Sequence, residues 1–146
     1  DVDELEGRSA AGEELLTPAI RSDDGSTGKL RLWGVVAGGK CREEAVTLPL
    51  ALDSGRCYVL VYTFCPGVDL RVKRHIAYAW HGALAKTQDI PASTMYIPDA
   101  LSTVGEGLVD KQTLAQGRET GHFLVVAGRL LLTLLPGGGV GGGGGA

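Results

Sequence analysis

The side chains that could carry chemistry include three cysteines and three histidines. They are Cys41, Cys57, Cys65, His75, His81 and His122. A structural zinc site needs four Cys or His ligands, usually with two cysteines about two to four residues apart, and this chain has no such pair. We therefore interpret the six residues as ordinary members of strands and loops. The odd number of cysteines favours a reducing compartment over a disulfide framework.

The sequence gives little evidence for a catalytic group of residues. The acidic pairs at 23–24 and 43–44 are neighbours in sequence, and neighbouring side chains of an extended chain point apart, so they do not form a general acid–base pair. DSG at 53–55 lacks the spacing of a serine nucleophile elbow. GALAKT at 82–87 lacks the glycines of a phosphate loop. The sequence therefore predicts neither an enzyme nor a cofactor-binding protein.

Charge and hydropathy argue against two further classes, nucleic-acid-binding proteins and membrane-spanning proteins. Lys and Arg total 14 against 17 acidic residues, for a net charge of -3, and the basic residues are scattered rather than gathered in a stripe that could follow a phosphate backbone. No apolar stretch reaches the roughly 20 residues of a membrane-spanning helix. The first residues, DVDELEGRSAAGEE, are acidic, unlike a signal peptide. We expect a cytoplasmic protein that binds no nucleic acid and inserts into no membrane.

The composition divides the chain into three parts. Residues 1–27 are rich in Glu, Ala, Ser, Gly and Asp and are interpreted as a linker. Residues 28–136 carry the apolar patterns of one domain. The glycine-rich tail at 137–146 can bury almost no apolar surface, so we expect it to be disordered.

Within the domain, the patterns predict an α+β fold with three layers. The run from 54 to 64 is almost continuously apolar, as expected of a central strand covered on both faces. Residues 84–101 have helical composition, with Thr87 as N-cap, Asp89 in the first turn and Pro98 positioned to kink or end the helix. A short helix or turn is expected within GHFLVV, residues 121–126. Further strands are expected at 29–36, 43–50, 75–82 and 108–114, with a closing strand after Gly128.

Four motifs follow one another in a recognisable order. They are SDDGSTGKLRLW (22–33), SGRCYVLVYTF (54–64), HIAYAWHGALAKTQDIPAS (75–93) and QGRETGHFL (116–124), and GRLLL follows them. In order and spacing they resemble the gelsolin-like repeat of the villin and gelsolin family, most closely its fifth repeat. Family members there read DDGSGK before a Trp strand, GGDCY before LYTY, W-x-G before the long helix and GKEPPHF before the last strand. The resemblance covers residues 22–136.

The resemblance implies a central mixed sheet of five to six strands between one long and one short helix. It implies an actin-binding module of a cytoskeletal regulator that caps, severs or bundles filaments under calcium control. Actin would be the partner together with neighbouring repeats, and phosphoinositide a further partner by family analogy. Because six repeats act together in such proteins, residues 1–27 are interpreted as an inter-repeat linker of a longer product or of a reduced copy. The alternative is a structural or protein-interaction repeat that only positions its neighbours. The residues that would contact actin are not assigned.

The family's calcium site can be compared residue by residue. Its ligands are a backbone carbonyl, the carboxylate of the following Asp, and a Glu in the first turn of the long helix, all oxygen donors suited to calcium. The corresponding positions are Gly55, Arg56 and Asp89. A cation replaces one carboxylate, so we expect a degenerate metal site formed by Gly55 and Asp89 that binds no calcium usefully. Weak binding and a misplaced alignment are the alternatives. An Arg56–Asp89 salt bridge would be a simple replacement for the ion.

One further departure concerns stability. The family's GKEPPHF reads GRETGHF here, so a rigid Pro-Pro pair becomes Thr120-Gly121. The replacement enlarges the conformational freedom of the unfolded chain and makes this segment costlier to order. The sequence therefore predicts a domain of the family's outline with reduced stability.

Overall fold

The computed structural model describes residues 28–65, 73–128 and 131–134. The expected linker at 1–27, most of the loop after Cys65 and the glycine-rich tail lie outside these residues. The division into linker, domain and tail therefore stays a prediction. The described part contains one larger sheet, one smaller sheet and two α-helices.

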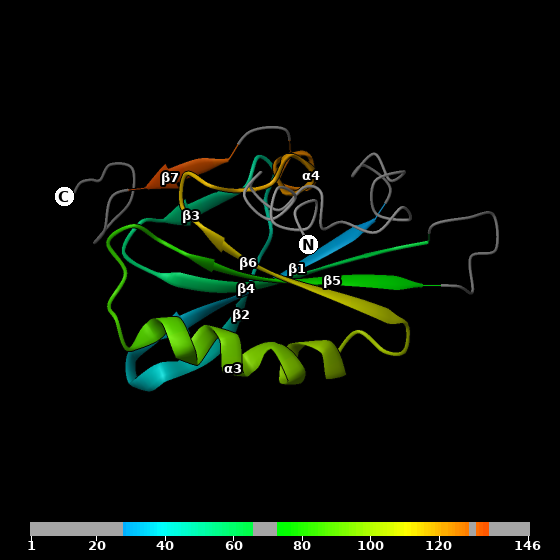
Figure 1. Cartoon of the computed structure of the whole chain (residues 1–146), viewed down its shortest axis with the longest axis horizontal. Coiled ribbons are helices and arrows are strands. Elements are labelled where there is room, and N and C mark those ends of the chain that lie inside the picture. The colour runs from blue at the N-terminus through cyan, green and yellow to red at the C-terminus, as the bar shows by residue number, and fades with distance from the viewer. Residues whose placement is uncertain (1–27, 66–72, 129–130, 135–146) are drawn as a thin grey trace, which may run out of the picture.

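The larger sheet has five strands in the order β2-β1-β4-β5-β6 (Figure 1). The strands are β1 (Lys29–Val36), β2 (Lys40–Glu44), β4 (Cys57–Phe64), β5 (Arg74–His81) and β6 (Leu108–Ala115). Neighbours run antiparallel except β5 and β6, which are parallel. A parallel pair needs a crossover, and the long helix supplies it. The expected mixed sheet is confirmed.

Strand β4 lies in the middle of this sheet, as its apolar run predicts. Val59 and Val61 pack in the cluster on one face, whereas Tyr58, Leu60 and Tyr62 pack in the cluster on the other. All five side chains are at most 3% exposed. The strand therefore contributes to both halves of the core, which explains why it shows no alternation of apolar and polar residues.

Helix α3 (Asp89–Ser102) covers one face of the sheet (Figure 1). Its Ile97 and Ala100 are buried against Trp33 of β1 and the valines of β4. The helix has 14 residues, and within the described part of the chain no helix is long and apolar enough to cross a membrane. The long helix predicted between 84 and 101 is confirmed, with a shorter extent.

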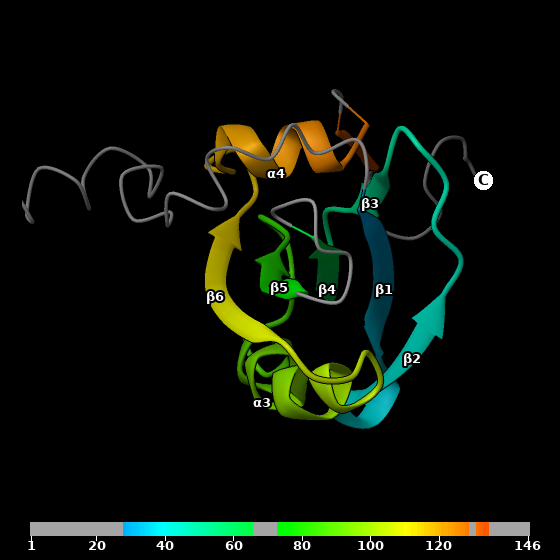
Figure 2. The ribbon, with the colours of Figure 1, turned by 90° about the vertical axis from the view of Figure 1, so that its right-hand side faces the viewer.

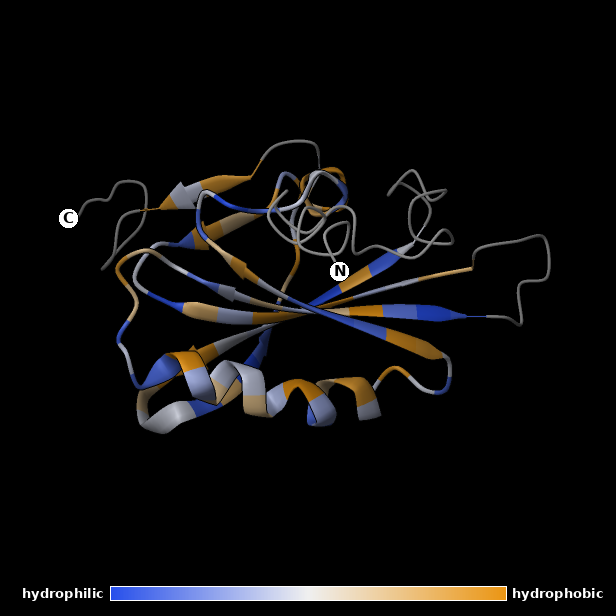
Figure 3. Ribbon diagram, viewed as in Figure 1, coloured by the Kyte–Doolittle hydropathy of each residue, from blue (hydrophilic) through white to orange (hydrophobic). Residues whose placement is uncertain are grey.

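The opposite face carries helix α4 (Gly121–Val126) and a small parallel sheet of β3 (Ala51–Asp53) and β7 (Leu132–Leu134). Figure 2 shows these elements on the side of the large sheet away from α3, so the molecule has three layers. Leu50, Leu52, Phe123 and Val126 fill the space beneath them. Figure 3 shows that these elements contain apolar segments. The predicted α+β class with one long and one short helix is confirmed.

The ends of α3 differ from the expectation. Gln88, not Thr87, occupies the N-cap position, and its side chain makes no capping hydrogen bond. Pro98 lies inside the helix, which continues to Ser102, so the prediction that it could end the helix is wrong. Both Pro98 and Thr94, whose carbonyl loses a partner, are exposed, and water can replace the missing bond. The expected kink stays a prediction.

One strand prediction was wrong in extent. The segment 43–50 was expected to be one strand, but β2 ends at Glu44 and the chain leaves the sheet before β3. Pairing between β1 and β2 ends at Glu44, which lies opposite Leu32. The first three residues of β1, Lys29–Arg31, pair only with β4. The closing strand expected after Gly128 is confirmed as β7, which pairs with β3 in the small sheet.

Candidate functional site

A tight turn at 53–56 leads into the central strand. The Asp53 carboxylate accepts a hydrogen bond from the Gly55 amide at 2.7 Å, and the Arg56 amide donates to the Asp53 carbonyl at 3.0 Å. The Gly82 amide donates to the Arg56 carbonyl at 3.0 Å. A side chain at Gly82 would collide with the backbone of Ser54, so a glycine is required there. These contacts fix the turn against the segment that precedes α3.

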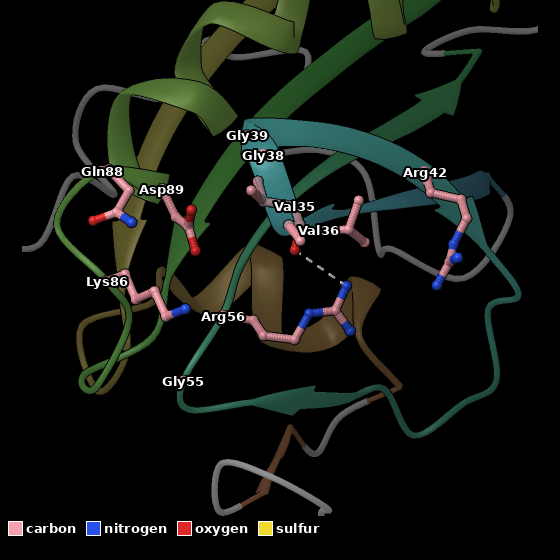
Figure 4. Close-up of a pocket in the computed structure, with 11 residues that line it drawn as sticks. Val35, Val36, Gly38, Gly39, Arg42, Gly55, Arg56, Lys86, Gln88 and Asp89 are labelled. Atoms are coloured by element: carbon pink, nitrogen blue, oxygen red, sulfur yellow. Dashed lines mark hydrogen bonds between the residues drawn. The ribbon is translucent and has the colours of Figure 1, made fainter.

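A pocket of about 630 Å³ opens beside this turn (Figure 4). It lies among the end of β1, the following 3₁₀ turn at Ala37–Gly39, strand β2, the 53–56 turn and the N-terminus of α3. Its lining residues are Val35, Val36, Ala37, Gly38, Gly39, Arg42, Gly55, Arg56, Lys86, Gln88 and Asp89. The residues singled out from the sequence, Gly55, Arg56 and Asp89, therefore border one pocket.

Arg56 pairs with Glu44, not with Asp89. Its Nη2 donates to the Glu44 carboxylate at 2.6 Å and lies 3.5 Å from the Val35 carbonyl. The guanidinium carbon lies 4.9 Å from the centre of the Tyr58 ring, a cation–π distance. In Figure 4 the Arg56 side chain extends away from Asp89. The expected Arg56–Asp89 salt bridge is therefore wrong.

The faces of the sheet explain this choice of partner. Glu44 lies opposite Leu32, and Leu32 packs in the core cluster on the α4 side, as does Tyr58. Arg56 precedes Tyr58 by two residues and packs over its ring, which places the arginine on the same face. Asp89 begins the helix that covers the other face. Glu44 is therefore the carboxylate within reach.

Gly34 of β1 makes room for the ion pair. A side-chain carbon at this position would overlap Nη2 of Arg56 and the carboxylate of Glu44. Strand β1 runs between β2, which carries Glu44, and β4, which Arg56 precedes. The two side chains therefore meet over Gly34 from opposite sides of β1. A glycine inside a strand often marks a close approach of this kind. Gly34 is therefore the feature of the sequence that could have indicated a close contact at this place. Glu44 was not singled out from the sequence as the partner of Arg56.

The pocket lining is rich in positive charge. Arg42 and Lys86 are exposed, and neither side chain forms a hydrogen bond or ion pair with another residue that the structure describes. Asp89 supplies the one carboxylate of the lining. Sequence reasoning did not single out Arg42 or Lys86, because lone exposed cations carry no local signal.

This set of donors does not fit a calcium ion. Calcium takes about six to eight oxygen ligands, several of them carboxylates. Here a divalent cation would meet one carboxylate and three positively charged side chains. Across the described ranges no group of three or more His, Cys, Asp and Glu residues is arranged to hold a metal ion.

Burial shifts several pKa values around the pocket. Burial, reinforced by the charge of Asp89, raises the pKa of Cys57 to about 11. The same causes raise the pKa of Cys41. For Arg56 burial opposes the charge, but the hydrogen bond to Glu44 and the neighbouring negative groups outweigh it, so its pKa is raised. Both thiols are thus protonated near neutral pH, and the arginine stays charged.

The histidines have structural partners. His75 is fully buried, with Nδ1 2.8 Å from Thr63 Oγ1 and Nε2 3.0 Å from the Glu106 carbonyl. Half-buried His81 lies 3.2 Å from Ser93 Oγ, and burial lowers its pKa. Since the Ser93 hydroxyl donates to the Ile90 carbonyl, it accepts from the His81 ring. The His122 ring packs edge-on against Tyr62.

The outer face of α3 is a second candidate surface. Met95 is 77% exposed and Ile90 37%, and Pro91 and Pro98 are also exposed. Residues 91, 95 and 98 follow the spacing that places side chains on one side of a helix. No basic residue occurs in α3. The exposed side of the helix therefore carries an apolar strip, bordered by exposed Thr94 and Asp99, which we call the α3 outer face. Exposed apolar patches on soluble domains commonly mark protein contacts.

Comparisons with known proteins give only distant similarities. No protein family model matches the chain, and no curated protein matches it in sequence. One similar solved structure is a chain of the Thorarchaeota ProGel/rabbit actin complex, with a TM-score of 0.48 and 17% identity over 68% of this chain and 100% of that chain. Another is mouse coactosin, an actin filament binding protein, with a TM-score of 0.43 and 12% identity over 86% of each chain.

Coactosin from Entamoeba histolytica is also similar, with a TM-score of 0.44 and 10% identity over 78% of this chain and 91% of that chain. At these scores and identities, the comparisons assign no family to the chain. The arguments about function below rest on its own residues and motifs.

Proposed function

We propose that this chain is an actin-binding module of a villin- or gelsolin-type cytoskeletal regulator, and that its calcium site is degenerate. The order of the four motifs motivates the class of protein. The observation that carries the proposal is the α3 outer face, an apolar helix surface left uncovered on a domain of the expected architecture. The full-length regulator would cap, sever or bundle filaments.

The α3 outer face suits a protein partner. Met95 is flexible and polarizable, so it can fill an irregular apolar groove. An amphipathic helix commonly binds by laying such a face into a hydrophobic groove, with anchors at helical spacing. Pro91, Met95 and Pro98 have this spacing, and Ile90 extends the surface by one residue. We propose that this helix face contacts actin.

The degenerate calcium site is supported by the reversed charge at Arg56. Its guanidinium is bound to Glu44 at 2.6 Å, so the turn at 53–56 has an internal partner in place of an ion. Neither the turn nor the start of α3 then needs calcium to be held in place. We propose that binding of actin by this chain is independent of calcium.

Co-sedimentation with actin filaments tests the proposal. The chain should pellet with filaments in a saturable manner, and Met95→Glu should weaken binding roughly tenfold, because it places a charge in the centre of an apolar contact. Glu is a good helix former, so the change should leave α3 folded. The matched control is Leu48→Glu, since Leu48 is 60% exposed and lies beside Gly128 after α4, away from α3.

Two outcomes would contradict the proposal. Absence of pelleting by the folded wild-type chain would favour a repeat that only positions its neighbours. Equal losses from Met95→Glu and Leu48→Glu would show that the α3 outer face is not the contact surface.

A further inference from the structure

The pocket beside the 53–56 turn is bordered by three cationic side chains that come from separate elements. Arg42 belongs to β2, Arg56 ends the turn, and Lys86 lies before α3. Asp89 is the one negative side chain among the lining residues. The pocket measures about 630 Å³, which leaves room for several side chains of a peptide. Its charge therefore suits a ligand that carries more than one negative group.

Arg56 is held in a fixed position within this pocket. Its two polar contacts, to Glu44 and to the Val35 carbonyl, both use Nη2. Its Nε and Nη1 therefore have no hydrogen-bond partner among the residues that the structure describes. Because a guanidinium has five N–H donors, the pairing with Glu44 orients the group and still leaves donors for a second carboxylate.

Arg42 and Lys86 add exposed charges on either side of this fixed one. Figure 4 shows Lys86 beside Asp89 at the helix end, whereas Arg42 comes from the strand on the other side of Arg56. Between them, the turn from β1 to β2 carries no bulky side chain, and a side-chain carbon at Gly38 would meet no atom within 4 Å. An extended chain can therefore approach the pocket over this turn.

The negative charge of the protein is concentrated in one short segment. Residues 1–14, DVDELEGRSAAGEE, contain six acidic residues and one arginine, so they carry a charge of -5. Residues 15–146 contain 11 acidic and 13 basic residues, so they carry a charge of +2. We call residues 1–14 the acidic segment. It is joined to a body of opposite net charge, and the two attract each other.

The acidic segment can reach the pocket. Strand β1 begins at Lys29, and its far end, Val36, borders the pocket, so the two points are about 23 Å apart along the strand. Residues 15–28 connect the acidic segment to β1 and can span up to about 45 Å when extended. Because this connection keeps the segment close to the pocket, even weak ion pairs can favour docking.

We propose that the acidic segment of this chain docks in the pocket, with its carboxylates paired to Arg42, Arg56 and Lys86. Acidic residues recur at positions 1 and 3 and at positions 4 and 6. In an extended chain, each such pair points to one side, so its two carboxylates can face separate cations. The free N–H groups of Arg56 then donate charge-assisted hydrogen bonds. The proposal goes beyond actin binding and does not depend on it.

Zero-length cross-linking of the full chain tests the proposal. A water-soluble carbodiimide joins a lysine amine to a carboxylate where the two groups touch, and mass spectrometry of the digest identifies the joined residues. At low ionic strength, we expect cross-links between Lys86 and acidic residues of the acidic segment. Their yield should fall as sodium chloride is added, because salt screens exposed charges.

A charge substitution in the pocket separates docking from overall attraction. Arg42→Gln should lower the yield of the Lys86 cross-links roughly threefold, the effect of losing one exposed ion pair. Arg42 does not react with the carbodiimide, so the loss reports docking rather than chemistry. The matched control is Arg118→Gln, since Arg118 is exposed outside the pocket and its replacement changes the net charge equally.

Three outcomes would overturn the proposal. The first is the absence of cross-links between Lys86 and the acidic segment, or an equal yield at Lys111, which is exposed on β6 outside the pocket. The second is an equal loss from Arg42→Gln and Arg118→Gln, because contact would then reflect overall charge. The third is seen in a mixture of isotope-labelled and unlabelled protein. Cross-links that join a labelled to an unlabelled chain would identify a second copy as the occupant, whereas cross-links confined to single chains support the proposal.

Discussion

The guanidinium of Arg56 and the carboxylate of Glu44 meet at 2.6 Å across Gly34, a glycine in the strand between them. The two side chains are 30% and 25% exposed, so the pair is partly shielded from water. The contact joins the end of β2 to the turn before the central strand. It also holds the arginine that borders the basic pocket.

Breaking this pair should lower the stability of the fold. Glu44→Gln removes the negative charge and leaves the half-buried Arg56 without its ionic partner, so we expect the free energy of unfolding to fall by about 1 kcal/mol. Urea denaturation measures the change. The control is Glu106→Gln, an exposed glutamate whose backbone carbonyl contacts His75. Equal effects of the two substitutions would show that the Arg56–Glu44 contact contributes nothing measurable.

Gly34→Ala should destabilise the protein only while the ion pair is present. The added methyl group would overlap both partners, so we expect a loss of about 1 kcal/mol, as the pair is displaced. In an Arg56→Ala/Glu44→Ala background, the same change should stabilise by roughly 0.5 kcal/mol, because alanine in a strand loses less entropy than glycine on folding. Urea denaturation of the wild type and the three variants provides the cycle. A loss of the same size in both backgrounds would refute the steric role of Gly34.

Features set by the residues of one segment were predictable from the sequence, whereas features set by distant segments were not. The central strand β4 was predictable because its apolar run reflects burial on both faces, a property of its own residues. The end of β2 was not predictable from the sequence. Glu44 is the last residue of that strand because the pairing with β1 ends there, and this depends on the path of another segment. Pro98 was expected to be able to end α3, but Ile97 and Ala100 anchor the last turn in the core.

The residues of the candidate site were also predictable only in part. The motif order placed Gly55, Arg56 and Asp89 together, and the structure puts them around one pocket. The partner of Arg56 depended on which face of the sheet each side chain occupies, which the sequence could not indicate without the strand order. Nor could it indicate that Lys86, 30 residues after Arg56 in the sequence, borders the same pocket.

Thr120 should stabilise the short helix α4. Its hydroxyl accepts a hydrogen bond from the Phe123 amide at 3.3 Å, and the side chain is buried. Thr120→Ala removes this N-cap and should lower the free energy of unfolding by about 1 kcal/mol. Thr120→Ser keeps the hydroxyl and should cost less. Equal losses in urea denaturation would show that the capping bond is not what this residue contributes. The cap offsets part of the flexibility expected from Thr120-Gly121.

The buried thiol of Cys57 should make the fold sensitive to alkaline pH. Burial and the charge of Asp89 raise its pKa from 9.0 to about 11, so the folded state favours the neutral thiol. This contribution is fully present below pH 9, where the thiol is protonated in both states, and is lost as the pH rises from about 9 to about 11. The urea concentration at the midpoint of unfolding should therefore decrease between pH 8 and pH 10.5, and the decrease should be larger in the wild type than in Cys57→Ala. An equal fall in both proteins would rule out Cys57 as a cause.

Calorimetric titration with calcium tests the central claim most directly, namely that Arg56 has reversed the charge preference of the pocket. We predict no saturable heat for the wild-type chain at micromolar calcium, and measurable binding for Arg56→Asp, which removes the cation and adds a carboxylate to that of Asp89. An unchanged titration of Arg56→Asp would mean that the calcium position was misassigned. Saturable binding of calcium by the wild-type chain at micromolar concentration would contradict the account.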